Sequence, residues 1–469
     1  MERRSGAKGN AEQPHMRRTQ SRESMSQRLS RVREAAKQRK KERFTALFHL
    51  LTAEALENAF LSLSRKAAAG VDGVRWKDYA ENLKVNIADL HRRLHQGSYR
   101  AQPGRRHYIP KADGKQRPLG IASLEDKIVQ YALVKILNAV YENDFMGFSY
   151  GFRPGRSQHN ALDALATGQV RTNVNWVLDA DISQFFDKVS HEWLIRFIEH
   201  RIGDQRVIRL IRKWLTAGTS EEGEWRASEE GTPQGAVISP LLANIYLHYV
   251  FDLWAHQWRR RHATGNVVMV RYADDIVIGF DKRIDAQCFR IAMQRRLKEF
   301  GLTVHPKKTR LMEFGRFAAE NRASRGKGKP ETFNFLGFTH ISGKDRSGRF
   351  MLIRKTRRDR MTATLKAIKD GLRKRWHYSI PEQGKWLRRV VQGYLNYHSV
   401  PGNYPMMRKF RIYVTDLWRR ALRRRSQQDD TTWTKANRLA AVWLPKVRVL
   451  HPWPVERFTA RHPRQEPGA

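Results

Sequence analysis

Two apolar segments of this chain each end in closely spaced aspartates, and this pattern limits the possible folds more than any other feature. Asp179 and Asp181 close the segment 176–178, and Asp274 and Asp275 lie between two short apolar runs. Burying such carboxylates unpaired is costly, whereas a divalent cation, which prefers oxygen ligands, neutralises them. Two strand ends that carry carboxylates can share two metal ions, which stabilise the attacking and leaving oxygens of a phosphoryl transfer. The sequence therefore predicts a metal site at strand ends, although an Asp-rich turn alone would also explain Asp274 and Asp275.

The charge of the chain indicates a polyanionic partner. Lys and Arg number 89 and Asp and Glu number 46, which gives a net charge of +43. Self-repulsion at this charge destabilises a compact chain unless a polyanion neutralises it. Because 40% of the residues are hydrophobic and 10% are aromatic, the chain can form a core, which a disordered basic tail cannot do. The composition excludes an enzyme with a near-neutral surface and favours a folded, multidomain nucleic-acid-binding protein.

The single cysteine and the apolar runs bear on the compartment of the protein. Cys288 is the only cysteine, so neither an internal disulfide nor a zinc site of paired cysteines is expected, and we predict a reducing, cytoplasmic location. The beginning of the sequence lacks the apolar stretch of a signal peptide. The apolar run 236–254 contains Pro240, Asn244 and Asp252, and we interpret it as a buried helix, not a membrane span.

Changes in composition predict four regions along the chain. Residues 1–44 carry 14 basic and 5 acidic side chains and are predicted to form a flexible basic arm. Helical and strand patterns alternate over 45–345. Helical spacing dominates 346–425, where the section 354–425 holds 21 basic and 4 acidic side chains. Residues 426–469 contain five prolines and are predicted to form an extended basic tail, with a DNA-binding remnant as one interpretation.

The ordered set of motifs resembles the reverse transcriptases of bacterial group II introns, the intron maturase family, over about 44–450. RYADDIVIGF resembles the family's signature motif, and LDADISQFFDKV resembles the motif with the first catalytic aspartate. Five further segments match in the family's order: KAAAGVDGV, IPKADGKQRPLGI, EEGTPQGAVISPLLANIYLHY, GLTVHPKKTRLMEF and FNFLGF. The resemblance implies an α+β right-hand polymerase, with fingers and palm in 45–345 and an α-helical thumb or maturase domain in 346–425.

The resemblance also implies the ligands of the metal site. Asp181 and Asp274 would be the principal ligands, with Asp275 beside them, and the carbonyl of Ile182 would add a backbone oxygen. The implied cofactor is a pair of Mg²⁺ ions, for which Mn²⁺ could substitute.

A nucleotide site is implied next to these metal ligands. Phe186 falls at the family's sugar gate, where a ring fills the space of a 2′-hydroxyl, although core packing would also explain it. Lys308 or Lys307 would lie near the pyrophosphate, with general RNA contact as the alternative. Asp179 and Asp187 are expected behind the site. The predicted nucleotide-binding residues are Lys111, Arg117, Phe186, Gln234, Gly235 and Lys308.

Residues 386–425 resemble the maturase or X region, which forms the thumb and binds intron RNA in the family. Arginines on one helix face with apolar residues on another can pack on a polymerase and follow phosphates. We interpret Tyr394, Tyr397 and His398 as core residues, with RNA contact as the alternative. The predicted RNA-binding residues are Arg388, Arg389, Arg408, Lys409, Arg411, Arg419 and Arg420.

Taken together, the motifs predict an RNA-directed DNA polymerase that binds its intron RNA, assists splicing and supports retromobility by target-primed reverse transcription. The family's cysteine-containing endonuclease domain is not expected here. The expected partners are group II intron RNA, an RNA template with a DNA primer, target DNA and dNTPs, without a membrane. A monomer and a dimer both remain open. Two alternatives also remain: a domesticated reverse transcriptase in defence or CRISPR adaptation, and a splicing cofactor that binds RNA without polymerising.

Overall fold

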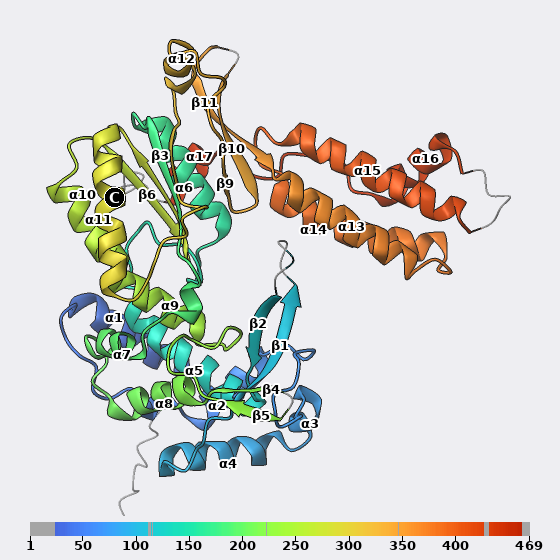
Figure 1. The fold of residues 1–469 in the computed structure, drawn as a ribbon. Coiled ribbons are helices and arrows are strands. Elements are labelled where there is room, and N and C mark those ends of the chain that lie inside the picture. Colours follow the sequence, from blue (N-terminus) through green and yellow to red (C-terminus); the bar gives the residue numbers. More distant parts are fainter. Residues whose placement is uncertain are drawn as a thin grey trace, which may run out of the picture.

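The computed structural model describes residues 24–110, 114, 116–221, 223–345, 347–425 and 431–461. Helices and strands are mixed along this part of the chain, and a helical arm projects from the rest (Figure 1). The α+β class predicted from the sequence is therefore confirmed. Among the described helices, none combines the length and the apolar character that crossing a bilayer requires.

A four-stranded antiparallel sheet carries both aspartate-bearing segments. Its strands lie in the order β6-β7-β3-β8 and span Val267–Tyr272, Asp275–Phe280, Trp176–Asp181 and Arg310–Glu313. Successive side chains of a strand point to opposite faces, so the sheet separates two cores. Leu178 and Ile278 pack in one core, and Val177 and Val277 pack in the other.

Helices cover both faces of this sheet. Helix α6 (Gln158–Arg171) packs against β6, and a Cβ on Gly168 would lie only 2.5 Å from Val268 Cγ1. Helix α11 (Arg283–Glu299) covers the other face and buries Phe289 there. The predicted buried helix 236–254 is present but interrupted. It consists of α9 (Ser239–Leu247), the π-helical turn η3 (His248–Asp252) and the start of α10 (Leu253–Arg261).

The region expected to form the fingers surrounds helix α5, which is buried along most of its length. A second sheet, in the order β2-β1-β4-β5, lies beside it. The segment 191–216 forms two helices because the chain turns at Gly203 and Asp204 caps the second. The elements here are α2 (Ala53–Ser62), α3 (Trp76–Glu81), α4 (Leu83–Gln96), β1 (Gly104–Pro110), β2 (Gln116–Ile121), α5 (Leu124–Tyr141), α7 (His191–Glu199), α8 (Gln205–Thr216), β4 (Thr219–Glu221) and β5 (Glu224–Arg226).

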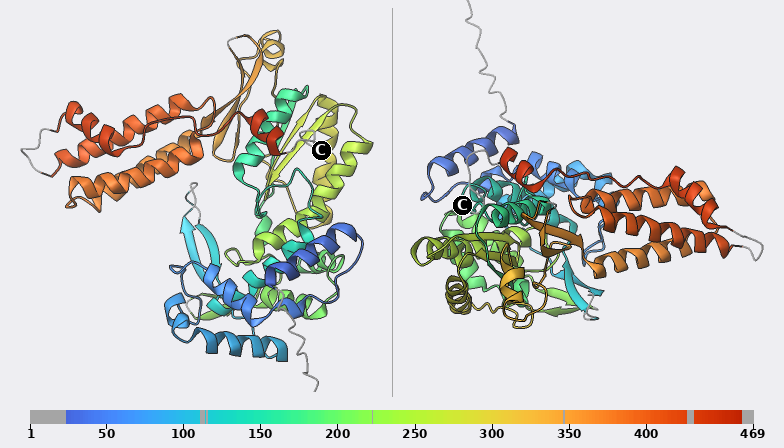
Figure 2. Two further views of the ribbon diagram at one scale, coloured as in Figure 1. Left: turned by 180° about the vertical axis from the view of Figure 1, so that it is seen from behind. Right: turned by 90° about the horizontal axis from the view of Figure 1, so that it is seen from above.

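The arm, which projects from the rest of the chain in Figures 1 and 2, consists of four helices that share a core of their own. They follow a three-stranded sheet of order β11-β10-β9, so the predicted boundary between 345 and 346 falls inside the β10–β11 hairpin and is wrong by about one strand. These elements are β9 (Phe333–Phe335), β10 (Phe338–Lys344), β11 (Phe350–Thr356), α13 (Arg358–Arg373), α14 (Ile380–His398), α15 (Tyr404–Arg423) and α16 (Trp433–Trp443), and the short α12 (Ala318–Ala323) precedes them.

The N-terminal region is more ordered than its composition predicts. Residues Met25–Gln38 form helix α1, which a capping box at Ser24 begins and which packs on α5. The guanidinium of Arg201 donates to the carbonyls of Ala36, Arg39 and Glu42. The flexible arm predicted over 1–44 is therefore wrong for this helix, while the residues before Ser24 lie outside the described part of the chain.

The C-terminal region also differs from the predicted extended tail over 426–469. After α16 the chain returns to the central sheet, where helix α17 (Pro454–Arg461) packs on α6. Phe458 is only 5% exposed in the core beneath the sheet. Prolines at the helix start and in the connecting segment are compatible with this path, because a proline suits the first helical position.

Candidate active site

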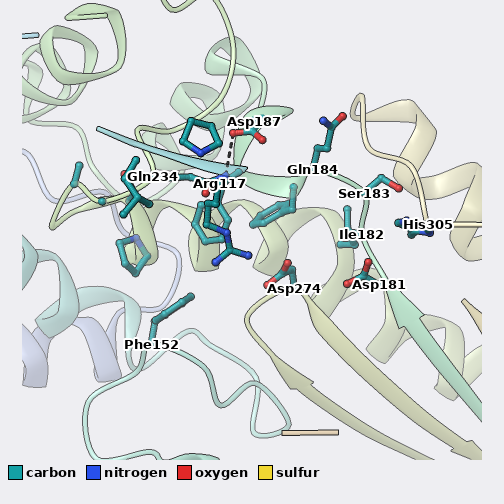
Figure 3. A pocket seen from close by; sticks show the side chains of 18 of the residues that line it. Arg117, Phe152, Asp181, Ile182, Ser183, Gln184, Asp187, Gln234, Asp274 and His305 are labelled. Carbon is teal, nitrogen blue, oxygen red and sulfur yellow. Dashed lines mark hydrogen bonds between the residues drawn. The ribbon is translucent and has the colours of Figure 1, made fainter. Parts of the chain in front are cut away.

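Strand pairing brings the predicted carboxylates together. Strands β3 and β7 are antiparallel with Asp181 opposite Asp275, and the turn between β6 and β7 carries Asp274. Figure 3 shows the carboxylates of Asp181 and Asp274 next to each other at the edge of one pocket. The two segments meet because the strand ends that bear them lie at the same edge of the sheet.

The carboxylates lie in an environment that disfavours their charged forms. Burial of its carboxylate raises the pKa of Asp275 to about 7, and the negative charges of Asp274 and Asp181 are the next largest causes. Part of the residue is nevertheless exposed at the surface. Burial also raises the pKa of Asp274, and it raises that of Asp179 to about 6 against the opposing charge of Arg310. Neighbouring carboxylates that resist ionisation in this way are suited to a divalent cation, which favours their charged forms.

The donor set fits a divalent metal in its chemistry. Carboxylate oxygens from Asp181 and Asp274 line one pocket, and hard oxygen ligands are what Mg²⁺ prefers. The described residues contain no group of three or more His, Cys, Asp or Glu side chains arranged to hold a metal ion. Instead, Lys308 Nζ donates to Asp181 Oδ2 at 3.0 Å and supplies the local positive charge.

A cavity of about 960 Å³ lies in front of these carboxylates, between the strand ends and the sheet of β1 and β2. The predicted residues that line it come from five separate segments of the chain. They are Arg117, Asp181, Ile182, Phe186, Gln234, Gly235, Asp274 and Lys308. Asp275 does not line the cavity, and Lys111 lies outside the described residues.

The loop with Gln234 and Gly235 approaches β2 very closely. Gly120 N donates to Gln234 O at 2.6 Å, and a Cβ on Gly235 would lie 2.9 Å from Gly120 O. Gly235 also has a φ of +109°, which favours glycine. The side chain of Gln234 donates to Asp187 Oδ1 at 3.0 Å. Asp187 therefore lines the cavity, and the expectation that it lies behind the site is wrong.

Two aromatic rings form another wall of the cavity. Phe186 is half-buried, with its ring edge-on to Phe185 at 5.3 Å between centroids and to Phe152 at 6.5 Å. Phe152 is 48% exposed and lines the same cavity. Sequence reasoning missed Phe152, because no local pattern separates it from the buried aromatic residues Phe148 and Tyr150 just before it.

The structure separates the two candidate lysines. Lys308 lines the cavity and pairs with Asp181, whereas Lys307 does not line it. His305 N donates to Asp181 O at 2.7 Å, so the segment that carries the lysine is joined to the end of β3. His305 itself lines the cavity and was also missed from the sequence.

The predicted RNA-binding cations of the helical arm differ in their surroundings. Arg388 donates to the carbonyls of Trp443 and Val442, and Arg411 donates to those of Pro445 and Ala440. Both therefore hold the C-terminal end of α16, which carries partial negative charge. Arg419 and Arg420 pair with Asp416, and the exposed cations Arg389, Arg408 and Lys409 complete the set.

The aromatic residues of α14 pack as core residues, as predicted. The Tyr394 ring stacks on Phe410 with 3.6 Å between centroids, and Tyr394 and His398 are buried. Tyr397 is half-buried, and its hydroxyl donates to Leu336 O at 2.8 Å. Tyr397 and His398 also contact the ring of Phe338 in β10, so they join the arm to the β9–β10 hairpin.

Comparison with known proteins adds an independent finding. Residues 109–340 match the family model described as reverse transcriptase (RNA-dependent DNA polymerase). The chain is 43% identical over 206 residues to protein YkfC of Escherichia coli K12, which covers 43% of this chain and 54% of YkfC. It is 37% identical over 223 residues to the group II intron-encoded protein LtrA of Lactococcus lactis, which covers 47% of this chain and 37% of LtrA. It is also 30% identical over 113 residues to nuclear intron maturase 2 of Arabidopsis thaliana, over 23% of this chain and 15% of that protein. The chain thus spans about half or less of the length of these relatives.

Proposed function

We propose that this chain, whose residues 109–340 match the reverse transcriptase family model and which is similar to a group II intron-encoded protein, is an RNA-directed DNA polymerase that also binds intron RNA as a maturase. The observation that carries the proposal is the shared cavity. Within it, Asp181 at the end of β3 and Asp274 in the β6–β7 turn lie together with the cations Arg117 and Lys308. Acid and base groups in this arrangement suit the transfer of a nucleotide, which needs positioning and charge stabilisation.

Reverse transcriptases generally use divalent metal ions, and we propose Mg²⁺ here, with Mn²⁺ as a substitute. Asp181 and Asp274 would hold the ions, with Asp275 beside them and the Ile182 carbonyl as a further oxygen. When bound, the ions stabilise charge on the attacking and leaving oxygens. Arg117, whose charge opposes the rise that burial causes in the pKa of Asp274, would hold the triphosphate.

The chain's own side chains perform the remaining steps. Lys308, now on Asp181, can turn toward the departing pyrophosphate and donate a proton or a charge-assisted hydrogen bond. Gln234 is oriented by Asp187 and would contact the incoming nucleotide. The ring of Phe186, which the ring of Phe152 supports edge-on, would occupy the space of a ribose 2′-hydroxyl and favour dNTPs.

Primer extension on an RNA template tests the polymerase assignment. Asp274→Ala should abolish DNA synthesis, because it removes a proposed metal ligand, and Asp89→Ala should not, because Asp89 lies on the surface of α4 and pairs with Arg92 and Arg93. Both variants should unfold at the same temperature as the wild type to within a few degrees. Synthesis that survives Asp274→Ala would overturn the assignment.

The maturase role and the alternatives separate in a second assay. Intron RNA, an RNA template with a DNA primer, and target DNA are the proposed partners. If binding suffices for splicing, Asp274→Ala should still assist splicing of the co-purified intron while its primer extension is lost. Co-purification of one structured intron would support the maturase proposal, and a mixed RNA population would favour the domesticated alternatives.

A further inference from the structure

The turn that presents Asp274 has a backbone conformation that its own sequence does not favour. Ala273 has a φ of +56°, in the left-handed region that residues other than glycine rarely adopt. Such a conformation persists only where surrounding contacts over-determine it, and it is found mainly at functional sites. The residues around the turn must therefore hold it in place.

Arg271, two residues before the turn, supplies one side of this support. Its Nη1 donates to Ala273 O at 3.0 Å and to Asn244 Oδ1 at 3.1 Å. The other donors reach the two Asp252 oxygens at 2.7 and 2.5 Å and Ser149 Oγ at 2.7 Å. A guanidinium has five N–H donors in a rigid fork, and these bonds occupy all of them in a fully buried side chain.

Asn244 and Gly151 support the turn from the other side. Asn244 Nδ2 donates to Gly151 O at 2.7 Å. A Cβ on Gly151 would lie 2.3 Å from Ala273 N, so the Gly151 backbone packs directly against the turn. One amide side chain therefore ties the guanidinium of Arg271 to this backbone.

Asp252 lies at the end of a π-helical turn that interrupts the α-helix. This turn is η3 (His248–Asp252), and single π-helical turns within α-helices frequently occur at functional sites. Arg271 and Asp252 are both fully buried. Well-packed apolar residues often stabilise a core as much as a buried ion pair does, so stability alone does not explain the pair. The ion pair with Asp252 does, however, orient the guanidinium of Arg271 so that it donates to the carbonyl of Ala273.

We propose that Arg271, oriented by Asp252 and Asn244, is a positioning residue for Asp274. By fixing the Ala273 turn, it keeps the Asp274 carboxylate beside Asp181, as Figure 3 shows these two side chains. The catalytic part of the inference rests on the proposed polymerase function. Loss of the Arg271 guanidinium should lower the rate of nucleotide addition and weaken metal binding, while nucleotide and template-primer binding stay nearly unchanged.

The variant Arg271→Lys keeps the charge but loses the fork. Its matched control is Arg201→Lys, which alters another buried arginine. Arg201 does not line the cavity; it pairs with Asp144 and donates to a carbonyl of α1. Thermal unfolding, kcat and KM for dNTP in primer extension, and Mn²⁺ binding followed by electron paramagnetic resonance are measured for both. Both variants should unfold at a lower temperature. Only Arg271→Lys should lower kcat, by roughly 10- to 100-fold with KM little changed, and weaken Mn²⁺ binding.

Equal kcat and Mn²⁺ affinity in the two variants, measured well below their unfolding temperatures, would overturn the inference. The double variant Arg271→Met with Asp252→Leu removes both buried charges together, so that neither remains unpaired. A folded double variant should still be slow and bind Mn²⁺ weakly, and wild-type values would also overturn the inference. If the wild type does not polymerise, the proposed function fails, while the Mn²⁺ comparison still decides whether Arg271 positions the carboxylates.

Discussion

At the scale of single residues, aromatic rings shape the cavity as much as the carboxylates do. Phe186 was predicted from the sequence, with core packing as the alternative, and its ring does both: it contacts Phe185 and it lines the cavity. Phe152, from a segment more than thirty residues earlier in the chain, lies edge-on to it. Discrimination against ribonucleotides is therefore expected to depend on a pair of rings.

Replacing either ring should relax sugar selectivity. Phe186→Ala removes the ring that would contact the 2′-hydroxyl and should raise incorporation of ribonucleotides relative to deoxynucleotides by at least about tenfold, which corresponds to roughly 1.4 kcal/mol. Phe152→Ala should have a smaller effect in the same direction, because its ring acts by supporting Phe186. The ratio of kcat/KM for rNTP and dNTP measures both. Phe317→Ala, at a ring that is 45% exposed and away from the cavity, is the control, and unchanged ratios in the first two variants would contradict the gate.

At the scale of elements, the two ends of the chain gave the largest differences from prediction. Helix α1 is strongly basic and has few apolar residues, so its composition is typical of a flexible arm. It is held by the packing of its apolar residues on the core, and the side chain of Arg201, more than 160 residues away, donates to the Ala36 carbonyl. Helix α17 similarly depends on α6, where Arg457 pairs with Asp163 and Arg171 donates to Thr459.

The docking of α17 should depend on one buried ring. Phe458→Ala removes a side chain that is 5% exposed and should cost about 3 kcal/mol of docking free energy, in the range for large-to-small core changes. Hydrogen exchange of the α17 amides should accelerate accordingly, while exchange in α5 should not change. Val449→Ala, at a side chain that is 47% exposed, is the control. Equal protection of α17 in both variants would show that the ring does not hold it.

The same junction should weaken in acid. The His159 ring stacks on His451 at 4.0 Å between centroids, and burial, followed by the charges of His451 and Arg457, lowers the pKa of His159 to about 3. Its pKa in the unfolded chain is about 6.5, so between these values the unfolded state binds more protons. The stability that neutral His159 contributes is therefore present above about pH 6.5 and is lost as the pH falls through that window.

Thermal unfolding between pH 7.5 and 5 measures this dependence. The His159→Gln variant, which cannot be protonated in this range, should show a flatter decline than the wild type. His107→Gln, at an exposed histidine of β1, should leave the slope as it is. A decline of the same slope in all three proteins would contradict the assignment to His159.

At the scale of the whole molecule, the charge of +43 is unevenly placed. The section 354–425 alone holds 21 basic and 4 acidic side chains, and it forms most of the projecting arm in Figure 1. Several of these cations bind backbone carbonyls or Asp416, as Arg388 and Arg411 show. The arginines on carbonyls keep their charge, but their N–H donors are used within the fold, so fewer donors remain for phosphates than the composition predicts.

Binding of structured intron RNA should weaken steeply with salt, by roughly 10³-fold between 50 and 200 mM if at least six phosphates are contacted. Replacing Arg389, Arg408 and Lys409 by alanine should reduce the slope of log K against log salt by about 2 to 3. The control replaces three exposed cations at or in α11, Lys282, Arg295 and Lys298, and removes the same charge. Identical slopes for the two triple variants would contradict an RNA-binding arm.

Features that depend on adjacent residues were predictable from the sequence. The aspartate pairs, the apolar strands that carry them, the buried helix within 236–254 and the order of the motifs are local patterns, because strand and helix periodicity is set over a few residues. The α+β class and the meeting of Asp181 with Asp274 followed from these patterns and the resemblance. Core packing of Tyr394 and His398 was predicted for the same reason, since both lie on the apolar side of a helix.

The tertiary structure alone decided which side chains face the cavity and which are used within the fold. It placed Lys308 rather than Lys307 on Asp181, turned Asp187 toward Gln234, and brought Phe152 to Phe186. It also ordered α1 and α17 and committed Arg388 and Arg411 to the end of α16. Each of these outcomes depends on a contact between distant segments, and the composition of a segment does not specify which distant acceptor or ring it will meet.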